Sequence, residues 1–171
     1  MLSTDSWVIE FGASNTTNTP EFKANPSHVG LSSPVTNTVP DNRSSRALIL
    51  VVERNPAVQQ LERYFLEHAG YEVEFVNDGL VALSRAQELR PRIVVAEILV
   101  PKLDGLSLCR AIKTDPNTKK ILVMIFSHLQ AQDRAAEAGA DAFLIKPLDE
   151  QLLIATLEKL LASRQASGET K

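Results

Sequence analysis

Four apolar runs of this sequence each end in residues that could take part in chemistry. These residues are Glu53 and Arg54 after residues 47–52, Glu97 in the run RIVVAEILVP at 92–101, Ser127 after 121–126, and Lys146 after 142–145. An unpaired carboxylate is costly inside a strand as apolar as the one that holds Glu97, so that side chain requires cations nearby. Arg54 and Lys146 would supply them, and their charges would cancel those of Glu53 and Glu97. The residue types therefore predict a charge cluster centred on Glu97.

The elements that must bring these residues together follow from the hydrophobic pattern. Short apolar runs, typical of strands, alternate along the chain with segments of helical spacing. The expected strands are 47–52, 71–76, 92–97, 121–126 and 142–145, and the expected helices are 56–70, 78–90, 105–113, 133–138 and 149–162. This alternation predicts an α/β fold, a doubly wound five-stranded parallel sheet with helices on both faces. In such sheets functional residues lie at the carboxyl ends of the strands, where the residues above are placed.

Helical periodicity also predicts which side chains face the sheet. In the first helix these are Val58, Leu61, Phe65 and Leu66. In the later helices they are Leu80, Leu83 and Ala86, then Leu106, Cys109 and Ile112, and finally Leu152, Leu153, Thr156, Leu157 and Leu160.

Composition narrows the class of protein. The chain has 171 residues, 44% of them hydrophobic, and a formal net charge of -3, which fits one globular domain plus an extra segment. It has no basic cluster that would bind nucleic acid, no apolar stretch near the roughly 18 residues of a membrane span, and no secretory signal. The single cysteine, Cys109, cannot form a disulfide within the chain and is expected to be a buried helix residue. We therefore expect a cytoplasmic protein with no nucleic-acid or membrane partner.

Residues 1–45 differ in character from the rest of the chain. Between 13 and 45 more than half of the residues are Ser, Thr, Asn or Pro, without helical or strand periodicity, which predicts a disordered leader. Upstream, the segment SWVIEF at 6–11 is interpreted either as a short docking peptide or as an apolar patch without a role. The expected organisation is a leader at 1–45, a globular domain at 46–163 and a polar tail at 164–171.

The globular part resembles the receiver domain of bacterial response regulators, which act in two-component signal transduction. The segments that carry the resemblance are LILVVERNP, PRIVVAEILVPKLDGLSLCRAIK, ILVMIFS and AGADAFLIKP. The resemblance implies a flavodoxin-like, CheY-like sheet with the strand order 2-1-3-4-5. It also implies that in working members an acidic pair after the first strand and an aspartate ending the third bind Mg²⁺. That aspartate accepts a phosphoryl group from a histidine kinase, and a Thr or Ser and a Lys then hold the phosphoryl oxygens.

Several positions match this pattern residue by residue. Glu53 fits the first acidic position, Ser127 the hydroxyl position and Lys146 the lysine. Phe143 fits the aromatic residue that turns inward on activation, and Pro147 follows Lys146 where the family usually has a cis peptide.

Two positions depart from the pattern in ways that reinforce each other. Arg54 stands where the family has the acid that ligates the metal directly, so we expect the Mg²⁺ site to be lost and no cofactor to bind. Glu97 stands in place of the phosphoacceptor aspartate and is one methylene longer, and a misplacement of about 1 Å can cost on the order of 10²-fold in rate. These departures indicate a degenerate member, a pseudo-receiver. Alternatively, Glu97 and Arg54 form a structural ion pair left from a lost site.

Smaller departures lie beyond the fourth strand. His128 follows Ser127 where the family favours Ala or Gly, and it is either a plug with a pH-sensitive contact or an exposed loop histidine. From 127 to 139 the chain is about three residues shorter than is usual in the family, close to one helical turn. The fourth helix is therefore expected to be short.

Three functions compete for this sequence. The favoured one is a stand-alone atypical receiver domain that acts in phosphorelay-type signalling as a protein–protein interaction module, without phosphorylation. The second is a phospho-accepting single-domain response regulator that tolerates Glu97. The third, a small nucleotide- or flavin-binding enzyme, is disfavoured because the segment VVERNPAV contains no glycine-rich phosphate loop. We therefore expect no enzymatic activity.

The expected partner is a signalling protein that binds the face formed by the fourth helix, the fifth strand and the fifth helix. A histidine kinase and a second copy of the chain are further candidates. The end ASRQASGETK is too short and polar for a DNA-binding unit, so output is expected to pass through protein contacts. If Glu97 mimics a phosphoryl group, Phe143 should turn inward, whereas pairing of Glu97 with Arg54 would leave the switch relaxed.

Overall fold

The computed structural model describes residues 47–147 and 149–166. The predicted leader at 1–45, with the segment at 6–11, and most of the tail at 164–171 lie outside the described residues. Strands and helices alternate in the described part, as predicted. The strands are β1 (Leu48–Val52), β2 (Glu72–Val76), β3 (Ile93–Ala96), β4 (Leu122–Ser127) and β5 (Ala142–Ile145). The helices are α1 (Pro56–His68), α2 (Gly79–Leu89), α3 (Gly105–Thr114), α4 (Gln132–Glu137) and α5 (Glu150–Ala166).

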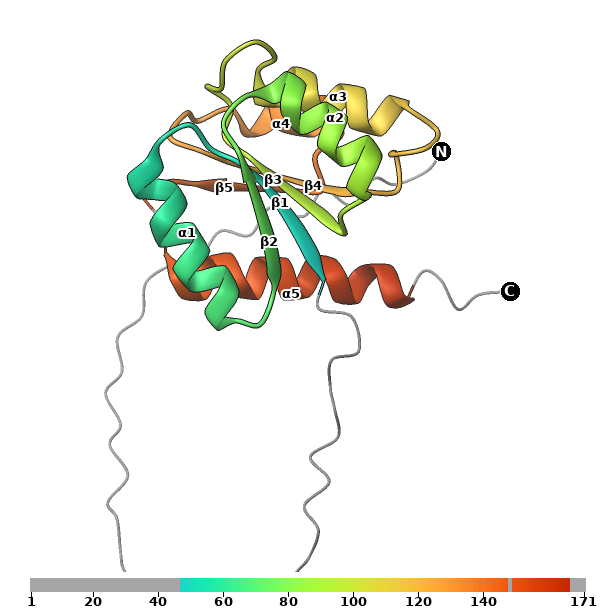
Figure 1. Cartoon of the computed structure of the whole chain (residues 1–171). Coiled ribbons are helices and arrows are strands. Elements are labelled where there is room, and N and C mark those ends of the chain that lie inside the picture. Colours follow the sequence, from blue (N-terminus) through green and yellow to red (C-terminus); the bar gives the residue numbers. More distant parts are fainter. Residues whose placement is uncertain (1–46, 148, 167–171) are drawn as a thin grey trace, which may run out of the picture. The chain divides into compact units, whose positions relative to one another are not determined.

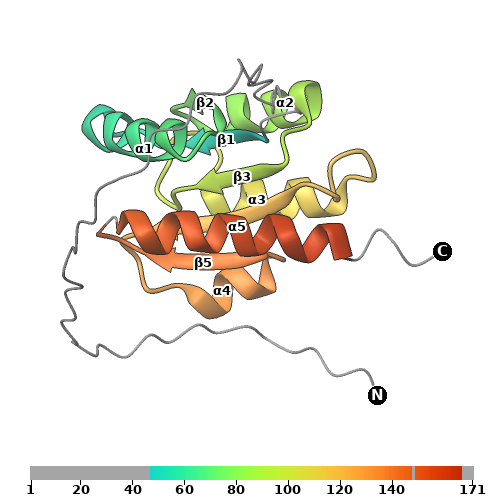
Figure 2. The same cartoon turned by 90° about the horizontal axis from the view of Figure 1, so that it is seen from below.

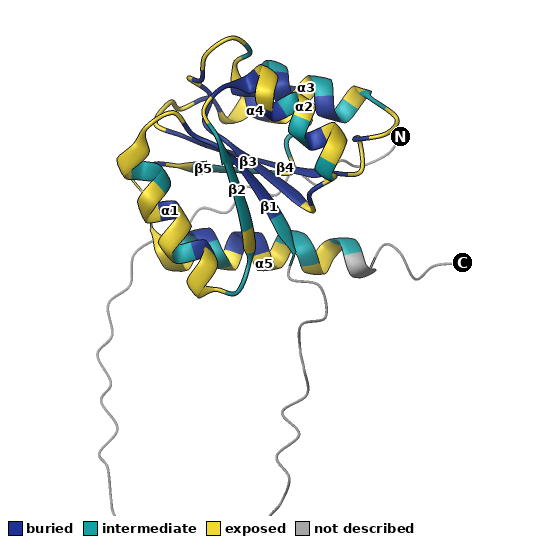
Figure 3. Ribbon diagram, in the orientation of Figure 1, coloured by how far each residue is buried: buried dark blue, intermediate teal, exposed yellow. Residues whose placement is uncertain are grey.

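All strand pairs of the sheet are parallel, and the strand order is β2-β1-β3-β4-β5. Helices α1 and α5 cover one face, and α2, α3 and α4 cover the other (Figure 1 and Figure 2). The doubly wound architecture and the order 2-1-3-4-5 are confirmed. Because β1, β3 and β4 are central and covered on both sides, nearly all of their residues are buried, whereas the edge strands β2 and β5 are mostly half-buried (Figure 3).

Two hydrophobic clusters lie on opposite faces of the sheet. Alternate residues of a strand point to opposite faces, so Leu50 packs with the cluster under α2, α3 and α4, while Ile49 packs with the cluster under α1 and α5. In β3, Val94 and Ile93 divide in the same way. This two-sided burial explains why the central strands are continuous apolar runs.

Side-chain caps fix where four of the helices begin, among them α5, where the Asp149 carboxylate accepts from the Leu152 N–H at 2.9 Å. The carboxylates of Asp78 and Asp104 accept hydrogen bonds from the first-turn amides of α2 and α3, and the Asn55 side chain does the same for α1. Each cap follows the carboxyl end of a strand, so the caps also set the direction in which the chain leaves the sheet.

The helix faces agree with the predicted periodicity except in two places. Leu106, Cys109 and Ile112 of α3 are fully buried or nearly so, as expected. Leu61 of α1 and Leu80 of α2, however, are 45% and 51% exposed, so their predicted inward orientation is wrong. The buried positions are taken by Glu62, four residues before Leu66, and by Ala82, four residues before Ala86.

Helix α4 contains six residues, in agreement with the short fourth helix expected.

None of the helices in the described part of the chain is long and apolar enough to cross a membrane.

Candidate functional site

Four of the residues singled out in the sequence lie together at the carboxyl edge of the sheet. The register pairs Val52 with Ala96, Ala96 with Ile125, and Ser127 with Ile145, so the residues that follow β1, β3 and β5 meet the end of β4 there. The four are Glu53, Glu97, Ser127 and Lys146, and each is at most 8% exposed. We call them the charge cluster.

Glu97 is the centre of the charge cluster. Its Oε1 accepts hydrogen bonds from the backbone N–H of Ile98 at 2.7 Å, from that of Leu99 at 3.3 Å, and from the Ser127 hydroxyl. Its Oε2 lies 3.2 Å from the Lys146 ammonium nitrogen. Both carboxylate oxygens are therefore engaged by donors of the protein itself.

Ser127 joins two loops. Its hydroxyl donates to Glu97 and accepts from the Leu129 backbone N–H at 3.2 Å. The loop between β4 and α4 is thereby tied to the end of β3.

Lys146 is shared by two carboxylates. Its ammonium donates to Glu53 Oε2 and faces Glu97 Oε2, and its side chain is 3% exposed. The same nitrogen lies 5.1 Å from the centre of the Phe126 ring. Glu53 is fixed in turn, because its Oε1 accepts from the Asn55 N–H at 2.7 Å and its own N–H donates to the Val76 carbonyl at 3.0 Å.

Hydrogen bonds and opposite charges outweigh burial in this cluster. Burial alone would raise the pKa of Glu97, but the hydrogen bond from Ser127 and the charge of Lys146 hold that pKa below its usual value. For Lys146 burial would lower the pKa, but the hydrogen bond that it donates to Glu53 and the negative charge around it raise the pKa. Glu97 and Lys146 are thus both charged in the folded protein at neutral pH.

Arg54 does not join the cluster. Its side chain is exposed, and among the described residues none forms an ion pair or hydrogen bond with it. The interpretation of Glu97 and Arg54 as a structural ion pair is therefore wrong, and so is the expected cancellation of charge. The buried cluster holds two carboxylates and one lysine, which leaves it with one negative charge.

His128 and Phe143 lie at the edge of the cluster. The His128 side chain is 69% exposed, as expected for a loop histidine, and its Nδ1 lies 3.5 Å from Glu97 Oε2, at the outer limit of a hydrogen bond. Phe143 is half-buried and packs against the hydrophobic cluster under α2, α3 and α4. The peptide between Lys146 and Pro147 is cis.

Glu62 is the residue that sequence reasoning missed. It lies in α1 and is 2% exposed, and its Oε2 has no hydrogen-bond partner among the described residues. Burial raises its pKa to about 8, the charge of Lys146 acts in the opposite direction, and Glu53 and Glu97 add to the rise. Its spacing of four residues from Val58 and from Leu66 was the signal that could have placed it inside.

The loop after β3 depends on a close approach of backbone to backbone. The N–H of Gly105 donates to the Ile98 carbonyl at 3.0 Å. A Cβ at Gly105 would lie 2.4 Å from the carbonyl oxygen of Glu97, a distance that no side chain could occupy. Glycine at this position therefore allows the chain to turn back over Glu97.

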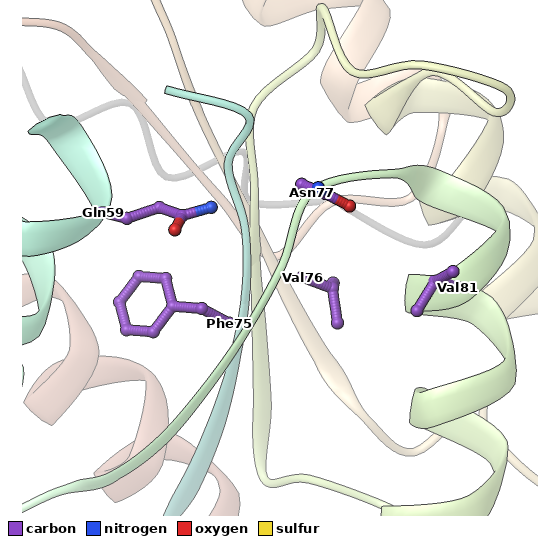
Figure 4. A pocket seen from close by; sticks show the side chains of 5 residues that line it. All are labelled: Gln59, Phe75, Val76, Asn77 and Val81. Carbon is purple, nitrogen blue, oxygen red and sulfur yellow. The ribbon is translucent and has the colours of Figure 1, made fainter. Parts of the chain in front are cut away.

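A separate pocket of about 310 Å³ lies beside the end of β2 (Figure 4). Its lining residues are Gln59, Phe75, Val76, Asn77 and Val81, contributed by α1, β2, the loop after β2 and α2 (Figure 4). Two of its lining residues contact Glu53 of the charge cluster: the Gln59 side chain donates to the Glu53 carbonyl, and the Val76 carbonyl accepts from the Glu53 N–H. No charged residue lines this pocket, so the charged side chains that could take part in chemistry are those of the charge cluster.

The acidic side chains of the cluster bear on whether a metal ion could bind there. Within 47–147 and 149–166, no three His, Cys, Asp or Glu side chains converge on a position where a metal ion could be held. Glu53 is occupied by Lys146 and by the Asn55 amide, and the Arg54 side chain points to solvent. Both carboxylates of the cluster therefore already have partners from the protein itself, whereas a divalent cation seeks several free oxygen ligands.

The parallel sheet and the residues at its carboxyl edge define the class of α/β protein to which the receiver domains belong. The sequence profile of the family described as response regulator receiver domain matches residues 49–158. The chain belongs to this family, whose members are modules of two-component signal transduction.

Individual relatives agree with this assignment. The chain is 34% identical over 116 residues to the DNA-binding dual master transcriptional regulator RpaA of Synechocystis, with 66% of this chain and 48% of that protein covered. It is 36% identical over 134 residues to the response regulator PleD of Caulobacter vibrioides, with 71% and 30% covered. The match therefore spans about half or less of the length of these relatives.

Solved structures give the same fold. A putative response regulator from Chloroflexus aurantiacus is similar with a TM-score of 0.66 and 28% identity, over 69% of this chain and 99% of that chain. The receiver domain of a sensor histidine kinase from Pseudomonas aeruginosa is similar with a TM-score of 0.64 and 28% identity, over the same shares. That structure has a magnesium ion coordinated in its active site cleft.

Proposed function

We propose that this receiver domain acts in signalling as a protein–protein interaction module that does not depend on phosphorylation. One observation carries the proposal, namely that Ser127 and Lys146 both hold the carboxylate of Glu97. The resemblance implies that these two positions hold the phosphoryl oxygens in a working receiver domain. Glu97 would thus permanently occupy Ser127 and Lys146, the residues that bind the phosphoryl group in a working receiver domain.

The surroundings of Glu97 also oppose its use as a nucleophile. A carboxylate that attacks phosphorus must present a free oxygen to the donor, but here one oxygen accepts three hydrogen bonds and the other faces Lys146. Phosphoryl transfer also relies on a metal to neutralise developing charge. The donor set around Glu53 and Arg54 supports the loss of that metal.

The competing function is a phospho-accepting response regulator. It is favoured by the response regulators among the relatives of this chain and by the fact that Glu97 is still a carboxylate. The two functions differ in one measurable property, covalent phosphorylation.

The decisive experiment incubates the full chain with acetyl phosphate and millimolar Mg²⁺ and measures its intact mass. The unmodified chain should gain no mass, and calorimetry should detect no Mg²⁺ binding. The double variant Arg54→Asp with Glu97→Asp, which restores three acids around the site, serves as the matched comparison and should gain one phosphoryl group. A gain of that mass by the unmodified chain would establish the phospho-accepting function instead.

We further propose that the partner binds the face of α4, β5 and α5. Ile145 of β5 is an exposed apolar side chain on this face, at 43% exposure, and Phe143 lies in the same strand. Ile145→Lys should abolish capture of the partner in a pull-down. Leu61→Lys changes an equally exposed apolar residue on α1, at 45%, and should leave capture intact. Loss of capture in Leu61→Lys alone would place the partner on α1.

A further inference from the structure

Glu62 is a buried acid that the proposed function does not use. Its carboxyl group is almost completely enclosed, and Oε2 has no hydrogen-bond partner among the described residues. A buried polar atom without a partner requires an explanation, and an ionised carboxylate in that position would be far more costly than a neutral one. Its neighbour in the helix, Arg63, is turned away to pair with Glu67 at 3.3 Å.

The charges that act on Glu62 come from the charge cluster. Lys146 after β5, Glu53 after β1 and Glu97 after β3 all contribute to its electrostatic environment. Of these groups only Lys146 is positive, and it already serves the other two carboxylates.

The described residues of the elements packed against α1 carry charges that act elsewhere or lie at the surface. On β2, Glu74 pairs with Arg85 at 2.5 Å, and Glu72 is exposed. On α5, Glu150, Glu158 and Lys159 are exposed, Glu158 acts on Tyr71, and half-buried Arg164 lies in the last turn of the helix. Lys146 is therefore the positive group that would serve as the counter-charge of an ionised Glu62.

We propose that Glu62 is a proton-operated switch of the charge cluster. While it holds its proton, Lys146 is shared between Glu53 and Glu97, and Ser127 and Lys146 together hold the Glu97 carboxylate. When the proton leaves to water, the third carboxylate attracts the Lys146 ammonium toward α1 and weakens its ion pair with Glu97. The proposal rests on the function proposed above for these Glu97 contacts and adds a signal, proton concentration, that controls them.

Two further observations support the proposal. The pKa of Glu62 is raised to about 8, chiefly by burial, so its proton is lost slightly above neutral pH. Coulomb interactions are also strong in a buried cluster, because water does not screen them as it does at the surface. A single added charge at Glu62 can therefore change how Lys146 is shared.

The test is an NMR titration of the full chain labelled with ¹³C and ¹⁵N. The side-chain carboxyl signal of Glu62 should titrate with a midpoint near 8. The backbone amide signals of Ser127 and Lys146 should shift with the same midpoint, because the hydrogen bonds around them change together.

Two matched variants separate this switch from other titrations. Glu62→Gln keeps the size of the side chain but cannot ionise, so the alkaline step at Ser127 and Lys146 should vanish. Glu67→Gln neutralises an exposed acid of the same helix and should leave that step unchanged. Any step caused by a group other than Glu62 and Glu67 would persist in both variants.

Three outcomes would overturn the switch. They are titration of Glu62 near the ordinary value of 4.5, titration near 8 without a response at Ser127 and Lys146, and survival of the alkaline step in Glu62→Gln. The first two need only the unmodified chain, so they decide the matter even if the variant folds poorly. Failure here is distinct from failure of the proposed function, which the mass of the chain after acetyl phosphate treatment decides.

Discussion

Four donors surround the carboxylate of Glu97: the backbone amides of Ile98 and Leu99, the hydroxyl of Ser127 and the ammonium of Lys146. Hydrogen bonds to an ionised group are stronger than those between neutral groups, so this arrangement fixes the side chain as well as its charge.

The two buried acids Glu97 and Glu62 should make the free energy of unfolding depend on pH in opposite directions. Glu97 should lower it as the pH falls, and Glu62 should lower it as the pH rises. The pKa of Glu97 is lowered from 4.5, so its stabilisation is present above that value and is lost as the pH falls through its folded pKa. The pKa of Glu62 is raised from 4.5 to about 8, so its contribution is present below 4.5 and is lost as the pH rises to about 8.

Urea unfolding across this pH range is the measurement that checks this prediction. The free energy of unfolding should decrease as the pH rises from 4.5 to about 8, and Glu62→Gln should remove most of that decrease. Glu97→Gln should instead remove part of the loss on the acid side. A stability of the unmodified chain that increases steadily from pH 4.5 to about 8 would contradict the assignment for Glu62.

Which residues meet at the charge cluster could be predicted from the sequence, except at two positions. Parallel strands end at the same edge, so Glu53, Glu97 and Lys146 had to approach one another. Arg54 is not part of the charge cluster because consecutive side chains of an extended chain point in opposite directions. The side chain that follows buried Glu53 therefore faces solvent. Glu62 was missed because hydrophobic periodicity marks apolar residues and gives no weight to a buried acid.

At the level of elements, the loop between β3 and α3 holds the cluster in place. Gly105→Ala would bring a Cβ to 2.4 Å from the Glu97 carbonyl oxygen, so the loop must move. We expect a loss of about 1–3 kcal/mol in the free energy of unfolding, typical of overpacking. The amide signals of Ser127 and Lys146 should shift as well, because a movement of the Glu97 backbone also moves the Glu97 carboxylate that both side chains contact.

Gly70→Ala is the matched control for this prediction. Gly70 has a φ of +87°, and a Cβ at this residue would meet no other atom within 4 Å, so alanine there introduces backbone strain but no collision. It should cost about 1–2 kcal/mol without changing the signals of the cluster. Unchanged signals of Ser127 in Gly105→Ala would show that the loop does not position Glu97.

The elements themselves were predictable where local pattern and burial agree. Short apolar runs became the central strands, and the α3 pattern of Leu106, Cys109 and Ile112 became a buried face. Periodicity failed at Leu61 and Leu80, since each helix has an alternative inward stripe one or two positions further along, and packing against the sheet selected that stripe.

At the scale of the molecule, alternation of strands and helices predicted a doubly wound sheet, but the strand order came only from the resemblance to receiver domains. Local pattern does not specify which strands become neighbours, because many orders satisfy the same alternation. The order β2-β1-β3-β4-β5 places β1, β3 and β4 in the centre. It is this order that buries the charge cluster, since Glu53, Glu97 and Ser127 follow or end the three central strands.

The rate at which the buried thiol of Cys109 on α3 reacts with a labelling reagent can report how often the molecule opens. It is fully buried, its thiol donates to the Ala138 carbonyl at 3.3 Å, and burial raises its pKa to about 11. Because it is the only cysteine of the chain, every thiol-labelling event followed by mass spectrometry reports exposure of this one position. Labelling should be far slower in buffer than in urea, and labelling as fast as that of a small free thiol would show that this corner is already open. The time course would thus measure how often the face of the sheet beneath α3 is uncovered, by local opening or by unfolding of the whole domain.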